Sequence, residues 1–340
     1  NATYSGLLTL GSSSRIVGGT GTITLSHSGT ITGSTFGLVL GGAQGGTINS
    51  IIGTGTGYVQ KRGAGTWTLT GNNTYSGNTT FYDDSGLGTL AISNSNALGS
   101  SAVTVSSGAT LSLTGNNMTV TNSITLNGTG FSTGGALRNV SGNNTYQGAI
   151  TLGADTRINS DSGTLTLDVA SGNGITGTFN LTFGGSGNLI VSDPIATSTG
   201  TLTKDGSGTL TLSATNTYTG STTISAGTIA VTTNDGLGTN GSGTTIGASG
   251  TLDIQGVNYS TTEGLTVNGG TIKTSTGTST FAGAISLGAT STVDVGGTQL
   301  TLSGIISGTS FGITKTSSGI LILSGTNTYT GVTTINAGTL

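Results

Sequence analysis

The strongest constraint on the fold is that the chain repeats itself. A string that begins at Lys204 returns almost unchanged at Lys315, and a less regular copy begins at Lys61. The interval from Lys61 to Lys204 is longer than the interval from Lys204 to Lys315. Internal repetition is typical of architectures in which each unit stacks on its neighbours, because such a stack tolerates the gain or loss of a unit.

A shorter period lies inside these long repeats. A small residue followed by alternating aliphatic residues recurs about every 23 residues. It appears near Thr22, Thr47, Thr66, Thr89, Thr110, Ala136, Thr164, Asn188, Thr209, Thr228, Thr251, Thr271, Thr298, Ile320 and Thr339. Counted with this signal, six steps separate Lys61 from Lys204 and five separate Lys204 from Lys315. The long repeats are therefore predicted to return after whole numbers of coils.

Each step holds short alternating runs such as the one at 209–212. Alternation sends leucine and isoleucine to one face of a strand and threonine to the other. Helices are disfavoured, because 65 of the 340 residues are glycine and threonine and serine are also abundant. We predict an all-β fold, a parallel β-solenoid (β-helix) of about 15 coils with about 23 residues per coil.

We expect a single elongated solenoid over 1–340 that is a fragment of a longer repeat array. The larger repeat units are placed near 61–203 and 204–314, with partial units at 1–60 and 315–340.

The repeated string resembles a known family. It reads Gly-Thr-Leu-Thr-Leu-Ser, then Asn-Thr-Tyr-Thr-Gly, then Thr-Thr-Ile and Ala-Gly-Thr, with copies at 208–229 and 319–340 and a degraded copy at 65–90. This resembles the autotransporter-associated β-strand repeat, also called the passenger-associated transport repeat. The resemblance implies a right-handed parallel β-helix in a bacterial surface or secreted protein. In that family the repeat is associated with export of the passenger across the outer membrane. The family carries no catalytic residues, so none transfer.

Two sets of residues mark the repeats. The aromatic markers are Tyr4, Tyr75, Tyr146, Tyr218, Phe281 and Tyr329. The basic positions are Lys61, Lys204 and Lys315 in one set, Arg138 and Lys273 in a second, and Arg15 and Arg157 in a third. Because both kinds of residue follow the repeat, we predict structural roles, with the aromatic rings packed at coil corners and the basic residues at turns. Contact with a sugar is the alternative for the aromatic rings.

Charge argues against several kinds of function. The chain has 8 basic and 11 acidic residues, so nucleic acid is not an expected partner. His27 is the only histidine and there is no cysteine, so we expect no metal site, and we expect no cofactor. The adjacent pair Asp83 and Asp84 is expected to be a solvated turn, with a cation contact as the alternative. The other acids are scattered, which is unlike the clustered carboxylates of a glycosidase.

We therefore predict a non-enzymatic, extracellular protein: the stalk, adhesin or fibre segment of an autotransporter-type passenger. A polysaccharide-active β-helix enzyme is the alternative, and an ice-binding solenoid is a minor one because threonine pairs recur. Expected partners are the chain itself, through continuation or end-to-end copies, and glycans or a receptor on a cell surface. No membrane insertion is expected, since no run of about 20 apolar residues occurs.

Overall fold

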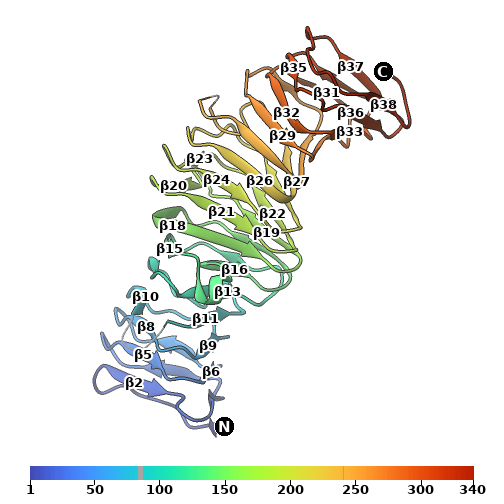
Figure 1. Cartoon of the computed structure of the whole chain (residues 1–340). Helices are drawn as coiled ribbons and strands as arrows, with labels where there is room; N and C mark the ends of the chain where they lie inside the picture. The colour runs from blue at the N-terminus through green and yellow to red at the C-terminus, as the bar shows by residue number, and fades with distance from the viewer. Residues whose placement is uncertain (83–86, 240) are drawn as a thin grey trace. The chain divides into compact units, whose positions relative to one another are not determined.

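The computed structural model describes residues 1–82, 87–239 and 241–340. The chain divides into two compact units, unit 1 (Asn1–Ala170) and unit 2 (Ser171–Leu340). In each unit, strands stack as successive turns of a coil (Figure 1). The turns number about 16 and lie about 21 residues apart. The prediction of an all-β parallel solenoid is confirmed, with slightly shorter and more numerous turns than the sequence signal suggested.

The strands of unit 1 are β1 (Ala2–Tyr4), β2 (Ser14–Val17), β3 (Ile23–Leu25), β4 (Thr30–Thr32), β5 (Leu38–Gly41), β6 (Gly45–Ile48), β7 (Ile51–Gly53), β8 (Val59–Arg62), β9 (Thr66–Leu69), β10 (Thr79–Tyr82), β11 (Thr89–Ile92), β12 (Val103–Val105), β13 (Thr110–Leu113), β14 (Thr119–Val120), β15 (Ile124–Gly128), β16 (Leu137–Asn139), β17 (Asn143–Tyr146), β18 (Ile150–Ser160) and β19 (Thr164–Leu167). A short 3₁₀ helix, η1 (Phe131–Thr133), precedes β16.

The strands of unit 2 are β20 (Ile175–Thr176), β21 (Leu181–Gly184), β22 (Asn188–Val191), β23 (Ile195–Ala196), β24 (Leu202–Lys204), β25 (Thr209–Leu212), β26 (Thr222–Val231), β27 (Thr244–Ile254), β28 (Asn258–Tyr259), β29 (Leu265–Asn268), β30 (Thr271–Thr274), β31 (Thr278–Phe281), β32 (Ile285–Ala289), β33 (Ser291–Val295), β34 (Gln299–Leu302), β35 (Ile306–Ser307), β36 (Ile313–Thr316), β37 (Ile320–Leu323) and β38 (Thr333–Ile335).

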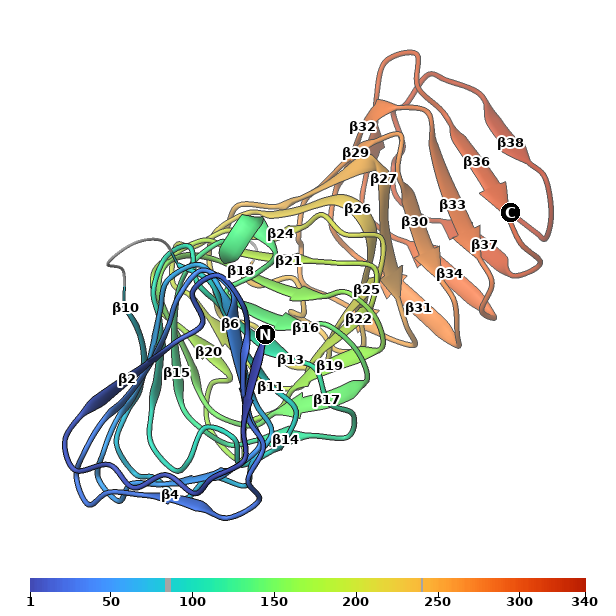
Figure 2. The same ribbon diagram turned by 90° about the horizontal axis from the view of Figure 1, so that it is seen from below.

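Each turn of unit 1 has three sides, and the strands of each side pair in parallel from turn to turn. Ladder A runs β1-β3-β6-β9-β11-β13-β16-β18. Ladder B runs β2-β5-β8-β10-β12-β15-β18. Ladder C contains β4-β7 and β14-β17-β19. The view from below shows β2, β4 and β6 on three sides of the outline of the turns (Figure 2).

Unit 2 is built in the same way. Ladder D runs β21-β24-β26-β27-β29-β32-β35. Ladder E runs β22-β25-β26-β27-β30-β33-β36-β38. Ladder F contains β20-β23 and β28-β31-β34-β37. The long strands β26 and β27 bend from ladder D into ladder E.

The core of unit 1 is a narrow stack of aliphatic side chains. On ladder A the register aligns Leu25, Ile48, Leu69, Ile92 and Leu113, none more than 5% exposed. Each such side chain contributes about 1.5–3 kcal/mol when fully buried. Because parallel pairing repeats the same inward position in every turn, the alternation seen in the sequence becomes a continuous column.

The prediction that the long repeats return after whole numbers of coils is wrong. Leu137, which follows the signal at Ala136, pairs with Ile158 of the next turn and not with a residue of the next signal, at Thr164. Thr164 instead pairs with Asn143 on ladder C. From Ala136 to Thr164 the sequence signal therefore advances by more than one turn, because it passes from ladder A to ladder C.

The same displacement occurs in unit 2. Thr271 pairs with Thr292 on ladder E, whereas Thr298 precedes β34 on ladder F. As a result Lys204 lies on ladder D and Lys315 on ladder E, so the long repeat does not return after a whole number of turns. The physical reason is that all three sides of a turn carry the same alternation, which cannot identify the side by itself.

Candidate functional site

The three repeated lysines lie in strands and point into the molecule. Lys61, Lys204 and Lys315 are at most 1% exposed. The Lys61 Nζ donates to the carbonyls of Arg62 and Gly63 at 3.0 and 2.5 Å. The sequence placed these lysines at turns; their backbones are in β8, β24 and β36, and their ammonium groups reach turn carbonyls.

The other two lysines bind in the same way. The Lys204 Nζ donates to the carbonyl of Gly206. The Lys315 Nζ donates to the carbonyls of Thr316, Ser317 and Ala337 at 2.8, 2.7 and 3.2 Å. Ala337 lies one turn further along the chain, so this ammonium group also ties two turns together.

Burial opposes the charge of these ammonium groups. It lowers the pKa of Lys61 to about 8. Burial also lowers the pKa of Lys315, against the opposing effect of the Asp294 carboxylate. Carbonyl oxygens that converge on the ammonium group replace the water that it has lost.

The glycine of the Ala-Gly-Thr part of the motif makes room for the lysine. Gly227 and Gly338 have φ values of 69° and 76°, which glycine adopts without steric strain. A Cβ atom at these positions would lie 2.9 Å from the Nζ of Lys204 and 2.8 Å from that of Lys315. The motif therefore requires glycine both for its backbone conformation and for the close approach of the ammonium group.

The asparagine of the motif bridges adjacent turns. Asn73 Oδ1 accepts from the Ile52 amide at 2.7 Å, and its Nδ2 donates to the Ala97 carbonyl at 2.6 Å. Asn216 makes the equivalent bonds to the Ile195 amide and the Gly236 carbonyl at 2.8 and 2.6 Å. At this corner the backbone is not in a strand. The asparagine side chain therefore makes the hydrogen bonds to adjacent turns that backbone amide and carbonyl groups make within the ladders.

The tyrosine of the motif closes the same corner. Tyr75, Tyr218 and Tyr329 each share a hydrogen bond with the threonine four residues later, at 2.7, 2.8 and 2.7 Å. Burial raises the pKa of Tyr75 and Tyr218 well above 10, so both phenols stay neutral. Lysine, asparagine and tyrosine keep the same spacing in all three copies. We call this set, with its threonine, the polar module.

The other aromatic markers differ in exposure. Tyr146 and Phe281 are fully buried, like Tyr75 and Tyr218, and the Tyr146 hydroxyl donates to the Asn122 carbonyl at 2.8 Å. Tyr4, in β1, is 47% exposed, and Tyr329 is half-buried.

Arg138 and Lys273 are partly exposed and pair with acids. Arg138 forms an ion pair with Asp161, 2.6 Å from Nη2 to Oδ2, and Lys273 lies 3.8 Å from Asp294. In both pairs the acid lies one turn further along the chain. Arg15 is exposed on ladder B, whereas Arg157 precedes Ile158 of ladder A, so the structure does not bring these two arginines to one ladder.

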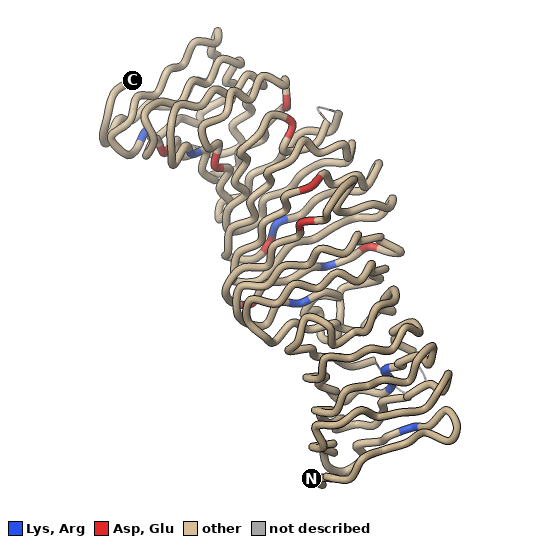
Figure 3. Tube along the Cα trace, turned by 180° about the vertical axis from the view of Figure 1, so that it is seen from behind, with Lys and Arg blue, Asp and Glu red and all other residues tan. Residues whose placement is uncertain are grey.

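The acidic residues of the described part of the chain form no cluster of three or more that could act as a metal site. Asp83 and Asp84 fall outside the described residues. Charged positions are scattered along the trace (Figure 3). Within the described residues, no helix is long and apolar enough to cross a membrane.

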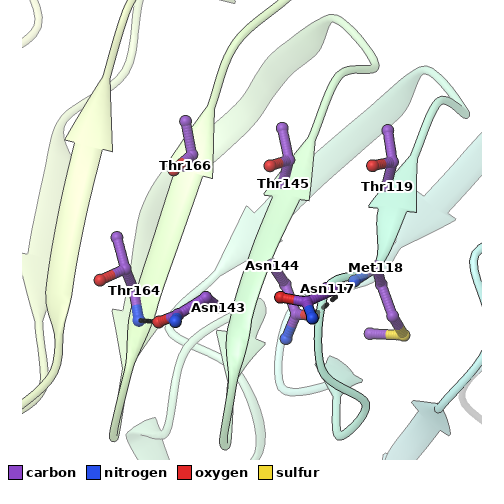
Figure 4. A pocket seen from close by; sticks show the side chains of 8 residues that line it. All are labelled: Asn117, Met118, Thr119, Asn143, Asn144, Thr145, Thr164 and Thr166. Atoms are coloured by element: carbon purple, nitrogen blue, oxygen red, sulfur yellow. Dashed lines mark hydrogen bonds between the residues drawn. The ribbon is translucent and has the colours of Figure 1, made fainter.

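A shallow groove of about 350 Å³ follows ladder C of unit 1. Thr119, Thr145 and Thr166 stand in register along it, with Asn143 and Thr164 beside them (Figure 4). Its lining is uncharged and consists mainly of asparagine and threonine. The groove thus offers hydroxyl and amide groups, whereas the polar modules use their hydrogen-bonding atoms inside the coil.

Replacing Lys61 by methionine should destabilise unit 1 by about 2 kcal/mol. Each buried carbonyl left without a donor costs about 1–3 kcal/mol, partly offset because no ammonium group is then buried. Urea denaturation followed by the fluorescence of Trp67, the single, fully buried tryptophan, measures the change in the same turn. Arg138→Met is the control. It removes an ion pair in which the Arg138 side chain is 39% exposed and should cost less than about 1 kcal/mol. Equal losses would show that the buried ammonium group has no special role.

Comparison with known proteins agrees with this arrangement. The model of a family described as passenger-associated-transport-repeat matches residues 59–82, 202–231 and 313–340, the three segments that hold the polar modules. The chain is also similar to the BmaC autotransporter adhesin of Brucella suis biovar 1 (strain 1330), with 36% identity over 264 residues. That alignment covers 64% of this chain and 7% of the adhesin, so the chain spans a small part of the relative's length. No solved structure matches the chain.

Proposed function

Because this chain carries three passenger-associated transport repeats, we propose that it is part of the passenger of a bacterial autotransporter adhesin. It acts at the cell surface as a non-enzymatic scaffold that holds binding surfaces away from the outer membrane. The observation that carries this proposal is the polar module. The residues that define the repeat bind the chain to itself.

A scaffold of this kind is stable for a simple reason. Parallel ladders extend through each unit, and the polar modules fix which residues of adjacent turns pair. The resulting surface consists largely of threonine, serine and glycine with few charges, which suits contact with varied partners through hydrogen bonds. Partners expected from the sequence, further copies of the chain and glycans or receptors of a cell surface, stay predictions.

The test is to display the chain on a non-adherent bacterium, fused to a translocator barrel, and to measure binding to cultured host cells. Folded chain should be accessible to protease added outside, and the displayed chain should raise adherence above that of the barrel alone. Failure to reach the surface, or unchanged adherence, would contradict the proposal. Cleavage of polysaccharides by the purified chain would instead favour the enzyme.

A further inference from the structure

One corner of unit 2 holds a carboxyl group where neighbouring turns hold small residues. The corner lies two residues before the first inward position of ladder D. In successive turns it is occupied by Gly200, Gly220, Ser242, Glu263, Gly283 and Gly304. Glu263 is also the only glutamate in the chain. Glu263 is not part of the repeat motif, so the polar module does not explain why a carboxyl group lies at this corner.

The Glu263 side chain is enclosed. It is 1% exposed, and its Oε1 accepts a hydrogen bond from the Thr244 hydroxyl of the preceding turn at 2.8 Å. Its Oε2 is buried without a hydrogen-bond partner. The following turn presses on its backbone, since a Cβ atom on Gly283 would lie 1.6 Å from the Glu263 carbonyl oxygen. The carboxyl group is therefore confined between two turns.

The titratable groups that act on Glu263 are acidic or neutral. Tyr218 and Tyr259 are fully buried, and Asp235, in the connection between β26 and β27, adds a negative charge. Among the described residues Glu263 has no ion-pair partner. Burial raises the pKa of Glu263 to about 7; the Thr244 hydrogen bond opposes this shift and Asp235 adds to it.

The two protonation states place different demands on this corner. A neutral carboxyl group fits, because one oxygen binds Thr244 and the other carries no charge. An ionised carboxylate would leave a charged oxygen without donor or water, and burial of an unpaired charge is costly. Ionisation must therefore be accompanied by local opening that lets water reach Oε2.

We propose that Glu263 makes this corner of the coil a pH-sensitive switch, closed when the carboxyl group is protonated and loosened when it ionises. The segment that responds is 258–268, which holds β28 and β29; β29 pairs with β27 and β28 pairs with β31. The direction of the pH dependence of stability follows from proton binding. The folded chain keeps the proton up to about pH 7 and the unfolded chain only to about 4.5. The stabilisation is thus complete below about pH 4.5 and is lost as the pH rises to about 7.

The single glutamate allows a direct experiment on the full chain. With ¹³Cδ-labelled glutamate, the protein should show one side-chain carboxyl resonance that titrates with a midpoint between about 6 and 8. In parallel, hydrogen exchange of 258–268, corrected for the intrinsic effect of pH, should become at least tenfold faster between pH 5.5 and pH 8. A midpoint near 4.5 would overturn the proposal.

Three variants locate the effect. Glu263→Gln, which keeps the shape without the charge, should exchange equally at both pH values. Asp235→Asn should move the midpoint to lower pH, because the charge that opposes ionisation is gone. Asp294→Asn, at a carboxylate paired with Lys273 on ladder E, should behave like the wild type. If Glu263→Gln retains the full pH dependence of exchange, Glu263 is not the switch.

Discussion

Replacing Tyr75 by alanine is expected to destabilise unit 1 by about 4 kcal/mol, since removing a large aromatic ring from a packed core costs about 3–5 kcal/mol. Tyr75 is fully buried in the turn that contains Trp67, and its hydroxyl group shares a hydrogen bond with Thr79 at 2.7 Å. The measurement is the free energy of unfolding from urea denaturation, followed by the fluorescence of Trp67. In a solenoid, stability depends on contacts between adjacent turns, so the probe reports the affected region.

Tyr4 provides the matched control. It stands at the same marker position of the repeat but is 47% exposed. Tyr4→Ala should therefore cost less than about 1 kcal/mol, and Tyr75→Phe, which removes only the hydroxyl group, about 1 kcal/mol. If Tyr4→Ala and Tyr75→Ala had the same effect, packing at the corner would not explain why the repeat keeps an aromatic residue.

Replacing Asn216 by leucine is expected to have the second large effect. We expect the free energy of unfolding to fall by about 3 kcal/mol, because each unsatisfied buried group costs about 1–3 kcal/mol. The leucine fills a similar volume but leaves the Ile195 amide and the Gly236 carbonyl without partners in a site that is 2% exposed. Because the single tryptophan lies in unit 1, hydrogen exchange measured by mass spectrometry is the suitable readout, with protection lost over 188–239.

Asn268→Leu is the control for this variant. Asn268 lies exposed at the end of β29 in the same unit. Its replacement should change the free energy of unfolding by no more than about 0.5 kcal/mol. A large loss of protection in Asn268→Leu, or none in Asn216→Leu, would refute the bridging role assigned to the motif asparagine.

Much of this architecture follows from the sequence. Alternation predicted the inward column that contains Leu25 and Ile48, and the repeated string resembled the family whose model matches three segments of the chain. These features are local, or they recur at fixed distances along the chain. They could be recognised without knowledge of which strands pair.

Other features could not be predicted in the same way. The repeated lysines were expected at turns because they follow the repeat. Their burial as internal donors was not expected, since lysine is rarely buried. Their constant spacing from the motif asparagine was the signal that could have linked them to the corner. Glu263 gave no such signal, because its burial depends on small residues in the turns on either side. The side of the coil on which each repeat lies depends on the strand register. The sequence does not determine this register, because the three strands of a turn have similar alternation.

The burial of the repeated lysine, asparagine and tyrosine side chains depends on this register, which cysteine pairs can test directly. The chain contains no cysteine, so a designed pair has no competitor. Thr271 and Thr292 are partners on ladder E, and both face outward. Neighbouring strands lie about 4.8 Å apart, which is within the range of a disulfide.

We expect the Thr271→Cys/Thr292→Cys variant to form an intramolecular disulfide under mild oxidation. The Thr271→Cys/Thr298→Cys variant, which joins two positions of the sequence signal on different sides of the coil, should stay reduced. Cross-linking of the second pair and not of the first would contradict the three-sided turn and the displacement of the repeats from one side to the next.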